Sequence, residues 1–224
     1  MTNSIKLFFG LFSLVVIMIS CTMQAYEAET FENLPEKTVA ILPYEVIFEG
    51  RTPRRISPED LEIMATSDSQ LFQSSLYENI ILRERRNRNF NLNVQDYHKT
   101  NFLLAQAGIG IKDSWYKDPV ELANILGVDA VIKSSVHTKR YLGDGASTAI
   151  AITTTILDVL TDEPSNDDGP TTGDVFVRTT IIDKESGTAM WSASENIATN
   201  YSLRADRAVD LINRRLIRRI RITD

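Results

Sequence analysis

The chain has 224 residues, of which 43% are hydrophobic and 24% are charged, and its formal net charge is −6. This composition is that of a globular protein, and it excludes disordered, collagen-like and multi-span membrane chains. The single cysteine excludes a disulfide framework within one chain and a zinc site built from several thiolates. The isoelectric point near 5.1 provides no overall basic field, which argues against nucleic acid as the main partner.

Residues 1–20 have the pattern of a secretory signal peptide. Lys6 supplies a positive start, residues 7–19 form an apolar run that is short for a bilayer span, and a serine precedes Cys21. The stretch 18–21 (MISC) resembles the bacterial lipobox, in which the cysteine is lipid-modified and becomes the first mature residue, although methionine stands where leucine is commonest. A general secretory signal with an incidental cysteine is the alternative. We expect cleavage before Cys21 and attachment of lipid to its sulfur.

The next segment is expected to tether the folded part of the chain. Residues 22–36 show no hydrophobic periodicity and contain several glutamates, so residues 21–36 are interpreted as the lipidated cysteine and a tether. Removal of the signal peptide removes one positive charge, that of Lys6, and leaves a mature net charge of −7. Residues 37–224 are then long enough to form one domain with a sizeable core.

The first predicted elements are a strand and a long helix. Residues 38–48 contain a four-residue apolar run that suits a strand covered on both faces, and Pro43 must lie at a bulge or at the end of the paired stretch. Ser57 followed by Pro58 predicts the start of a helix. Apolar residues at three- and four-residue spacing predict its buried face: Leu61, Met64, Ala65, Leu71, Phe72, Leu76 and Ile80.

The middle of the chain alternates between strand and helix patterns. Residues 90–94 alternate apolar and polar side chains, which predicts a second strand. A short helix is expected over 99–107, and another begins at Pro119 and ends at Gly127. The β-branched run 128–136 predicts a third strand.

The second half contains an ambiguous segment and a hairpin. Residues 145–160 are compatible with a strand or a helix, and we prefer the helix. Residues 161–172 are acidic with two prolines and are expected to form a solvated loop. Two β-rich runs, 174–183 and 188–197, are joined by a turn with Gly187 and predict a hairpin.

The chain is expected to close with a helix over residues 203–220. Its predicted buried positions are Leu203, Ala208, Leu211, Ile212, Leu216 and Ile220. The order of these elements predicts a single α/β domain with a mixed β-sheet flanked by helices.

Three stretches together resemble a group of envelope lipoproteins with a TolB N-terminal-like fold, the CsgG-like and LpoB-like group. They are residues 39–44 (VAILPY), residues 121–132 (ELANILGVDAVI) and residues 175–191 (VFVRTTIIDKESGTAMW), spread over most of the mature chain. The resemblance implies a non-enzymatic protein that works by binding or by assembling, and it supplies no catalytic residues. The pore of CsgG-like members needs two amphipathic membrane hairpins, whereas this chain offers at most one stretch, residues 147–160, so we predict that it forms no pore.

The sequence contains no phosphate-binding loop, nucleophile elbow or histidine-based zinc motif. We therefore expect no catalytic residues, no metal and no cofactor. A serine–histidine–acid site is conceivable around His98 or His137, but ordinary surface histidines are favoured. The acidic residues within 162–168 could hold calcium, but Pro164 stands where the first ligand would lie, and a solvated loop is favoured.

Two groups of residues are candidates for binding a partner. Trp115 and Tyr116 are expected in a loop before a helix, as an exposed aromatic anchor, whereas Trp191 is expected in the core. The last helix carries more arginines than capping requires, which favours contact with lipid head groups or an acidic partner over a purely solvated face. The candidate arginines are Arg214, Arg215, Arg218 and Arg219.

These features predict a non-enzymatic, lipid-anchored protein that binds envelope proteins at the outer membrane of a diderm bacterium, facing the periplasm or the cell surface. A secretion or cell-wall accessory role is the expected context, and a homo-oligomer is compatible with the sequence. A subunit of a CsgG-like secretion pore is the alternative, and an uncharacterised hydrolase is the third hypothesis.

Overall fold

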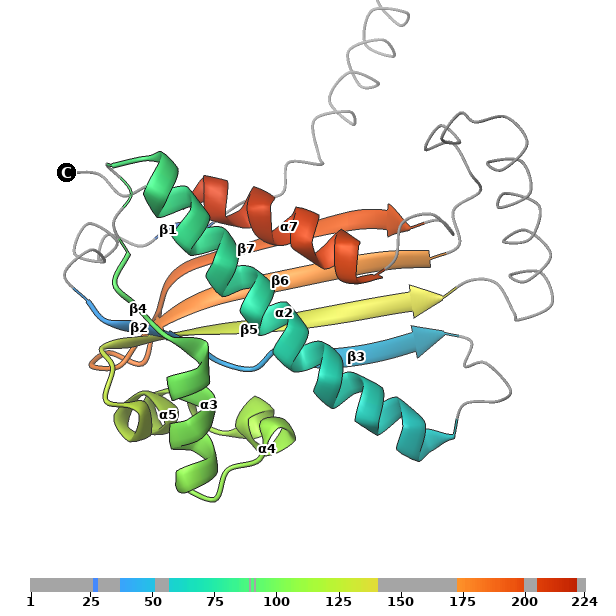
Figure 1. Cartoon of the computed structure of the whole chain (residues 1–224), viewed down its shortest axis with the longest axis horizontal. Coiled ribbons are helices and arrows are strands. Elements are labelled where there is room, and N and C mark those ends of the chain that lie inside the picture. The colour runs from blue at the N-terminus through green and yellow to red at the C-terminus, as the bar shows by residue number, and fades with distance from the viewer. Residues whose placement is uncertain are drawn as a thin grey trace, which may run out of the picture.

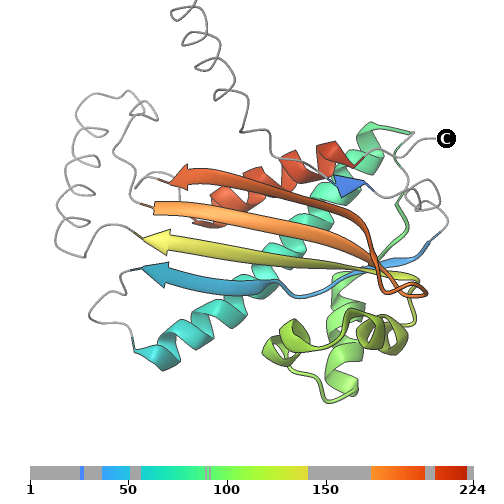
Figure 2. The same cartoon turned by 180° about the vertical axis from the view of Figure 1, so that it is seen from behind.

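The fold was obtained as a computed structural model (Figure 1). The structure describes residues 26–27, 37–50, 57–88, 90, 92–140, 173–199 and 205–220. Within these residues, helices lie on both faces of one mixed β-sheet (Figures 1 and 2). The predicted α/β class, with a mixed sheet flanked by helices, is confirmed.

The sheet has the strand order β1-β7-β6-β5-β2-β4, and β3 also pairs with β5. The pairs β2–β4, β2–β5 and β3–β5 are parallel, whereas β5–β6, β6–β7 and β1–β7 are antiparallel. The strand bounds are Tyr26–Glu27 (β1), Val39–Ile41 (β2), Glu45–Gly50 (β3), Val94–Gln95 (β4), Ala130–Arg140 (β5), Gly173–Asp183 (β6) and Ala189–Thr199 (β7).

The first predicted strand is interrupted at Pro43. Val39 of β2 lies opposite Ala130 of β5, and Glu45 of β3 lies opposite Ser135, so the pairing register changes by one residue between β2 and β3. Proline has no amide hydrogen to donate to the ladder, which explains why the interruption falls here. The expectation for this residue is confirmed.

The predicted long helix is α2 (Pro58–Arg86). Its N-terminus is closed by a reciprocal cap, since the Asp60 amide donates to the Ser57 hydroxyl at 3.1 Å and the Ser57 amide donates to the Asp60 carboxylate at 2.9 Å. The hydrogen bonds that the Ser57 amide and hydroxyl donate to the Asp60 carboxylate lower the pKa of Asp60. The helix start predicted from Ser57 and Pro58 is confirmed.

The predicted apolar face of α2 was partly wrong. Met64 and Leu71 are exposed, because each lies about 100° around the helix from a buried neighbour. Gln73 is fully buried instead, and its Nε2 donates to the Ile41 carbonyl at 2.7 Å, which satisfies the amide without solvent. The buried polar residues of α2 are Ser69, Gln73 and Asn79.

The helices α3 (Tyr97–Gln106) and α5 (Pro119–Leu126) confirm two further predictions, and Gly127 ends α5 at a positive φ of 66°. The helix α4 (Ile111–Tyr116) was not predicted, because six residues are too few to show a helical period. The second strand predicted over 90–94 was wrong in extent, since only β4 pairs there. Phe90 and Leu92 are buried without belonging to a strand, whereas Val94 lies in β4 and is half-buried.

The last helix, α7 (Ala205–Arg219), is confirmed. Four of its predicted buried positions are buried, but Leu211 is exposed and Val209 and Ile217 are buried in addition. The predicted hairpin of β6 and β7 is also confirmed, and Gly187 in its turn has φ 66°. Leu203 lies outside the described residues.

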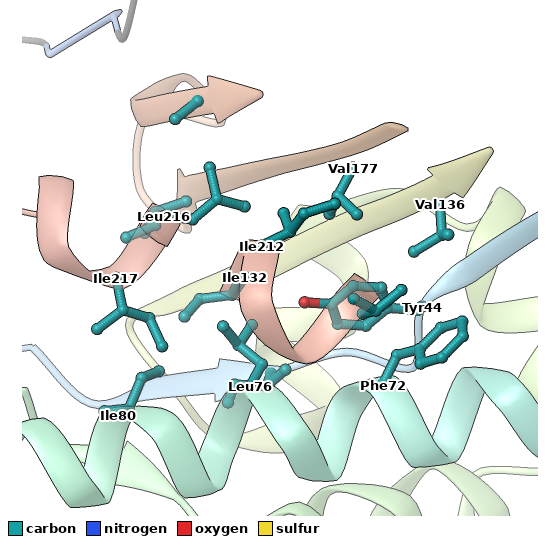
Figure 3. Packing of buried hydrophobic residues seen from close by; sticks show 14 of the residues in the cluster. Tyr44, Phe72, Leu76, Ile80, Ile132, Val136, Val177, Ile212, Leu216 and Ile217 are labelled. Carbon is teal, nitrogen blue, oxygen red and sulfur yellow. The ribbon is translucent and has the colours of Figure 1, made fainter. Parts of the chain in front are cut away.

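The main core lies between the sheet and the two helices α2 and α7 (Figure 3). Trp191, Tyr44 and Phe72 are among its largest fully buried side chains, so the core position predicted for Trp191 is confirmed. A second cluster, which includes Leu104, Leu122 and Val131, lies on the opposite face of the sheet, beneath α3 and α5. Each face of the sheet near β2 is thus covered.

Several predictions fall outside the described part of the chain. These include the ambiguous segment 145–160, with the candidate membrane stretch 147–160 inside it, and the acidic loop 161–172. Within the predicted tether, Tyr26–Glu27 forms β1 and pairs with β7. Of the described helices, none combines the length and the apolar character that a bilayer crossing requires.

Candidate functional site

One half of the sheet presents polar and aromatic side chains on the face that lies opposite α2 and α7. The helices α3 and α5 cover this face near β2, and no described helix lies over its β3, β5, β6 and β7 part (Figure 2). We call this surface the open face. Alternation along the strands assigns to it Glu45, Ile47, Glu49, Lys133, Ser135, His137, Lys139, Asp174, Phe176, Arg178, Thr180, Ser192, Ser194 and Asn196.

The centre of the open face is an aromatic row. Strand register places Ile47, His137, Phe176 and Asn196 side by side across β3, β5, β6 and β7. The rings of His137 and Phe176 have centroids 6.1 Å apart and an interplanar angle of 73°, an edge-to-face contact. An apolar and aromatic strip therefore runs across β3, β5 and β6, and the amide of Asn196 continues the row on β7.

Charged rows flank the aromatic row on both sides. Register pairs Glu49 with Lys139 and Lys139 with Asp174 in one row. The row on the other side contains Glu45 and Arg178. Between these rows the surface is hollowed by about 440 Å³, lined by Glu49, Ser135, His137, Lys139, Asp174, Phe176, Arg178 and Asn196.

Arg178 is an exposed cation of this surface. Its guanidinium carbon lies 5.8 Å from the centroid of the Phe176 ring, within the range of a cation–π contact. Within the described residues Arg178 forms no ion pair. Arginine and aromatic residues are the types that contribute most to protein–protein binding energy.

His137 is oriented by a carboxylate on the neighbouring strand. Its Nδ1 lies 2.8 Å from Oε1 of Glu49, and the two residues are 88 positions apart in sequence. Ser135 lies on the same face two residues away, but no hydrogen bond joins it to His137 in the described structure. The pair fixes the ring that forms the edge-to-face contact with Phe176.

The aromatic anchor predicted before α5 was half wrong. Trp115 is only 5% exposed and packs in the main core, whereas Tyr116 is 76% exposed. Both residues lie on the helix α4 and not in a loop. Adjacent side chains of a helix point about 100° apart, so Trp115 turns inward and Tyr116 turns outward. Tyr116 alone stays a candidate surface anchor.

The arginines of α7 fall into two pairs. Arg215 Nη1 lies 3.3 Å and Arg219 Nη2 lies 2.5 Å from the carboxylate oxygens of Glu195, a buried residue on β7. These two arginines hold α7 against the sheet, a role that the sequence prediction did not include. Arg214 pairs with Asp210 on its own helix, and Arg218 Nε donates to the Arg214 carbonyl at 3.2 Å.

The other predicted site residues are placed as follows. His98 is exposed on α3, and its ring centroid lies 4.0 Å from that of Tyr97. Cys21 and the acidic residues of 162–168 lie outside the described residues. Among the residues that the structure describes, no three histidine, cysteine, aspartate or glutamate side chains are grouped as a metal ion would require.

Sequence reasoning identified the hairpin but not the surface that it carries. The alternation along β6 places Asp174, Phe176, Arg178 and Thr180 on one face, so their common side was readable from the sequence. The pairing of β3 with β5 was not readable, since it joins segments about 90 residues apart.

No family model matches the chain, and no curated protein matches it. Solved structures with a similar fold do exist. The chain is similar to the PelC dodecamer from Paraburkholderia phytofirmans, at 12% identity and a TM-score of 0.46, over 91% of this chain and 99% of that chain.

Two further solved structures are similar. One is lipoprotein GNA1162 from Neisseria meningitidis, at 12% identity and a TM-score of 0.39, over 82% of this chain and 96% of that chain. The other is the LpoB C-terminal domain from Salmonella enterica, at 12% identity and a TM-score of 0.37, over 73% of this chain and 83% of that chain. At such low identity the likeness concerns the fold alone. The LpoB-like part of the sequence resemblance is thus matched by solved structures, and the CsgG-like part stays a prediction.

Proposed function

We propose that this chain is a lipid-anchored, non-enzymatic protein of the bacterial envelope that binds a partner protein through its open face. The observation that carries the binding role is the aromatic row, with Phe176 at its centre and Arg178, free of any described counter-ion, beside it. This combination supplies an apolar contact and a charged hydrogen-bond donor on a surface without a described helix over it.

The size of the open face favours a transient contact or the centre of a larger one. At a strand spacing of about 4.8 Å and a rise of about 3.3 Å per residue, four strands of seven residues cover roughly 400 Å². A stable protein–protein interface buries about 800 Å² on each partner. The open face alone therefore fits a partner that is bound and released.

The anchor is supported by the lipobox-like stretch that ends at Cys21. Each buried methylene of an acyl chain contributes about 0.8 kcal/mol, so two or three chains hold a protein on a membrane almost permanently. Residues 1–20 act as the signal peptide, residues 21–36 carry the lipid and the tether, and residues 37–224 form the domain. The outer membrane, on its periplasmic or outer side, is the proposed location.

Mass spectrometry of the protein from a membrane fraction tests the anchor. We expect a mature N-terminus at Cys21 with the mass of attached acyl chains, and we expect Cys21→Ala to prevent lipid attachment. A mature N-terminus elsewhere, or an unmodified Cys21, would contradict the lipid anchor.

Paired substitutions test the open face. Phe176→Ser with Arg178→Glu should reduce the amount of partner that co-purifies from membranes in mild detergent, at an unchanged melting temperature. The matched control is Phe102→Ser with Arg207→Glu, because both residues are exposed and lie on α3 and α7, outside the open face. Equal partner recovery from both double variants would refute binding through the open face.

A further inference from the structure

The strand β3 lies at one edge of the sheet. It pairs with β5 on one side, and within the described residues no strand pairs with its other side (Figures 1 and 2). An edge strand presents unpaired amide and carbonyl groups, which can accept a further strand from another chain. The free edge of β3 therefore offers six residues of backbone for pairing with a further strand.

The helix layer extends farther than the sheet at this edge. The N-terminal end of α2 projects beyond β3 in both views of the molecule (Figures 1 and 2). Apolar residues at that end are exposed. Ile63 is 68% exposed, whereas Leu76, over the middle of the sheet, is 2% exposed. A strand added beside β3 would continue the sheet toward the part of α2 that the sheet does not reach.

The side chains of β3 define what an added strand must carry. On the open face β3 presents Glu45, Ile47 and Glu49, an acid–x–apolar–x–acid pattern. The two acids are separated by 4 positions, and each would lie beside a residue of the added strand on the same face. Opposite charges across neighbouring strands stabilise the pairing, and like charges weaken it.

We infer that the free edge of β3 binds an extended segment of a partner protein with the pattern basic–x–apolar–x–basic, added to the sheet as a further strand. The inference rests on the proposed protein-binding function and specifies the chemistry of the partner. The added strand also widens the open face, because its residues continue the rows that contain Phe176 and Arg178.

A second copy of this chain is the less suitable occupant. An antiparallel pair of two β3 strands centred on Ile47 would place Glu45 of each copy opposite Glu49 of the other. Both cross-strand pairs would then be like-charged, which opposes association. A partner strand with two basic residues would form oppositely charged pairs at both positions.

Two peptides with the same backbone test this inference. The probes are the fluorescent peptides TKTVTKT and TETVTET, measured by fluorescence polarisation against the full-length chain in detergent micelles. Each cross-strand charge pair contributes about 0.2–1 kcal/mol, so two pairs favour the lysine peptide by roughly 2-fold to 30-fold. The preference should shrink as salt screens the charges.

Charge reversal on β3 gives the decisive comparison. Glu45→Lys with Glu49→Lys should transfer the preference to TETVTET. The neutral variant Glu45→Gln, which leaves the Glu49–His137 contact in place, should reduce the preference while it retains the fold. The control is Glu78→Lys with Glu185→Lys, which changes the net charge equally at two exposed sites outside the open face and β3. This control should keep the preference for TKTVTKT.

The position of binding is read by hydrogen exchange. The lysine peptide should slow amide exchange within residues 45–50. Absence of any peptide preference, protection elsewhere but not in β3, or a dimer of the chain that both peptides fail to dissociate would each overturn the inference. If the peptides fail while the open-face variants still lose their partner, the β3 inference falls and the proposed function stands.

Discussion

The hydroxyl of Tyr44, a side chain labelled in Figure 3, donates a hydrogen bond to Oδ1 of Asn213 at 2.8 Å, and both side chains are fully buried. This bond joins the interruption between β2 and β3 to the middle of α7. Asn213 Nδ2 in turn donates to the Ser75 hydroxyl of α2 at 3.2 Å, and Ser75 donates to Asp210 at 3.1 Å. A chain of polar contacts, buried at Tyr44 and Asn213 and half-buried at Ser75 and Asp210, thus fixes both helices against the sheet, on the side opposite the open face.

Removal of the Tyr44 hydroxyl should destabilise the protein. Burial raises the pKa of Tyr44, so the hydroxyl remains a donor, and Tyr44→Phe leaves a buried amide oxygen without it. We expect a loss of about 1–3 kcal/mol in the free energy of unfolding by urea. The control Tyr116→Phe, at an exposed hydroxyl, should change it by less than about 0.5 kcal/mol. A loss at Tyr44→Phe as small as the one expected for the control would contradict a stabilising role of the Asn213 bond.

Two leucines on α2 distinguish the observed face of the helix from the one predicted from spacing. Leu76 is 2% exposed and Leu71 is 49% exposed. Leu76→Ala should cost about 2–5 kcal/mol because it opens a cavity, whereas Leu71→Ala should cost less than about 1 kcal/mol. Chemical denaturation measures both, and a larger loss at Leu71 would contradict the orientation of α2.

The ion pair between Lys37 and Asp183, at 2.7 Å, should set part of the acid sensitivity. Burial raises the pKa of Asp183, but hydrogen bonds from Lys37 and Ser186 outweigh it and lower the pKa below its ordinary 3.8. A lowered folded-state pKa contributes stability above 3.8 that is lost as the pH falls through the folded value.

Asp183→Asn should therefore flatten the fall in stability below about pH 4, and its effect should be constant from there to pH 9. The hydrogen bond to Asp183 raises the pKa of Lys37 above 10.5. The positive charge of Lys37, and with it the ion pair, is therefore lost only at a pH above that value. Thermal melts across the pH range measure this. An identical acid limb in wild type and variant would show that the pair has no such role.

Glu195 should matter for the attachment of α7 to the sheet. Its buried carboxylate faces both Arg215 and Arg219, so Glu195→Gln should lower stability by about 1–3 kcal/mol, reduced from the value for a fully buried pair because the arginines are half-exposed. Arg214→Ala and Arg218→Ala should have little effect, since both side chains are exposed. Losses of stability at Arg214→Ala or Arg218→Ala as large as the loss at Glu195→Gln would contradict the division seen in the structure.

Local signals explain which parts of the fold were predictable. Pro119 and Gly127 mark the ends of α5 by their own backbone preferences, and the turn at Gly187 does the same for the β6–β7 hairpin. Such features depend on a few adjacent residues. Helix and hairpin bounds therefore came within a few residues of the structure.

The candidate site depended on contacts between distant segments. Glu49 and His137 meet because β3 and β5 are parallel neighbours, and such pairing follows from the whole topology and not from any local pattern. Helical geometry likewise decided that Trp115 turns inward while Tyr116 turns outward. The lipid anchor, in contrast, rests on a local motif, which is why it could be proposed from sequence.

Photocross-linking in living cells tests the central claim most directly. A benzophenone amino acid at position 176 of the full-length lipoprotein should give a discrete adduct with another envelope protein, because Phe176 lies at the centre of the open face. The same amino acid at position 207, an exposed site on α7, should give none. An adduct from position 207 without one from position 176 would contradict binding through the open face.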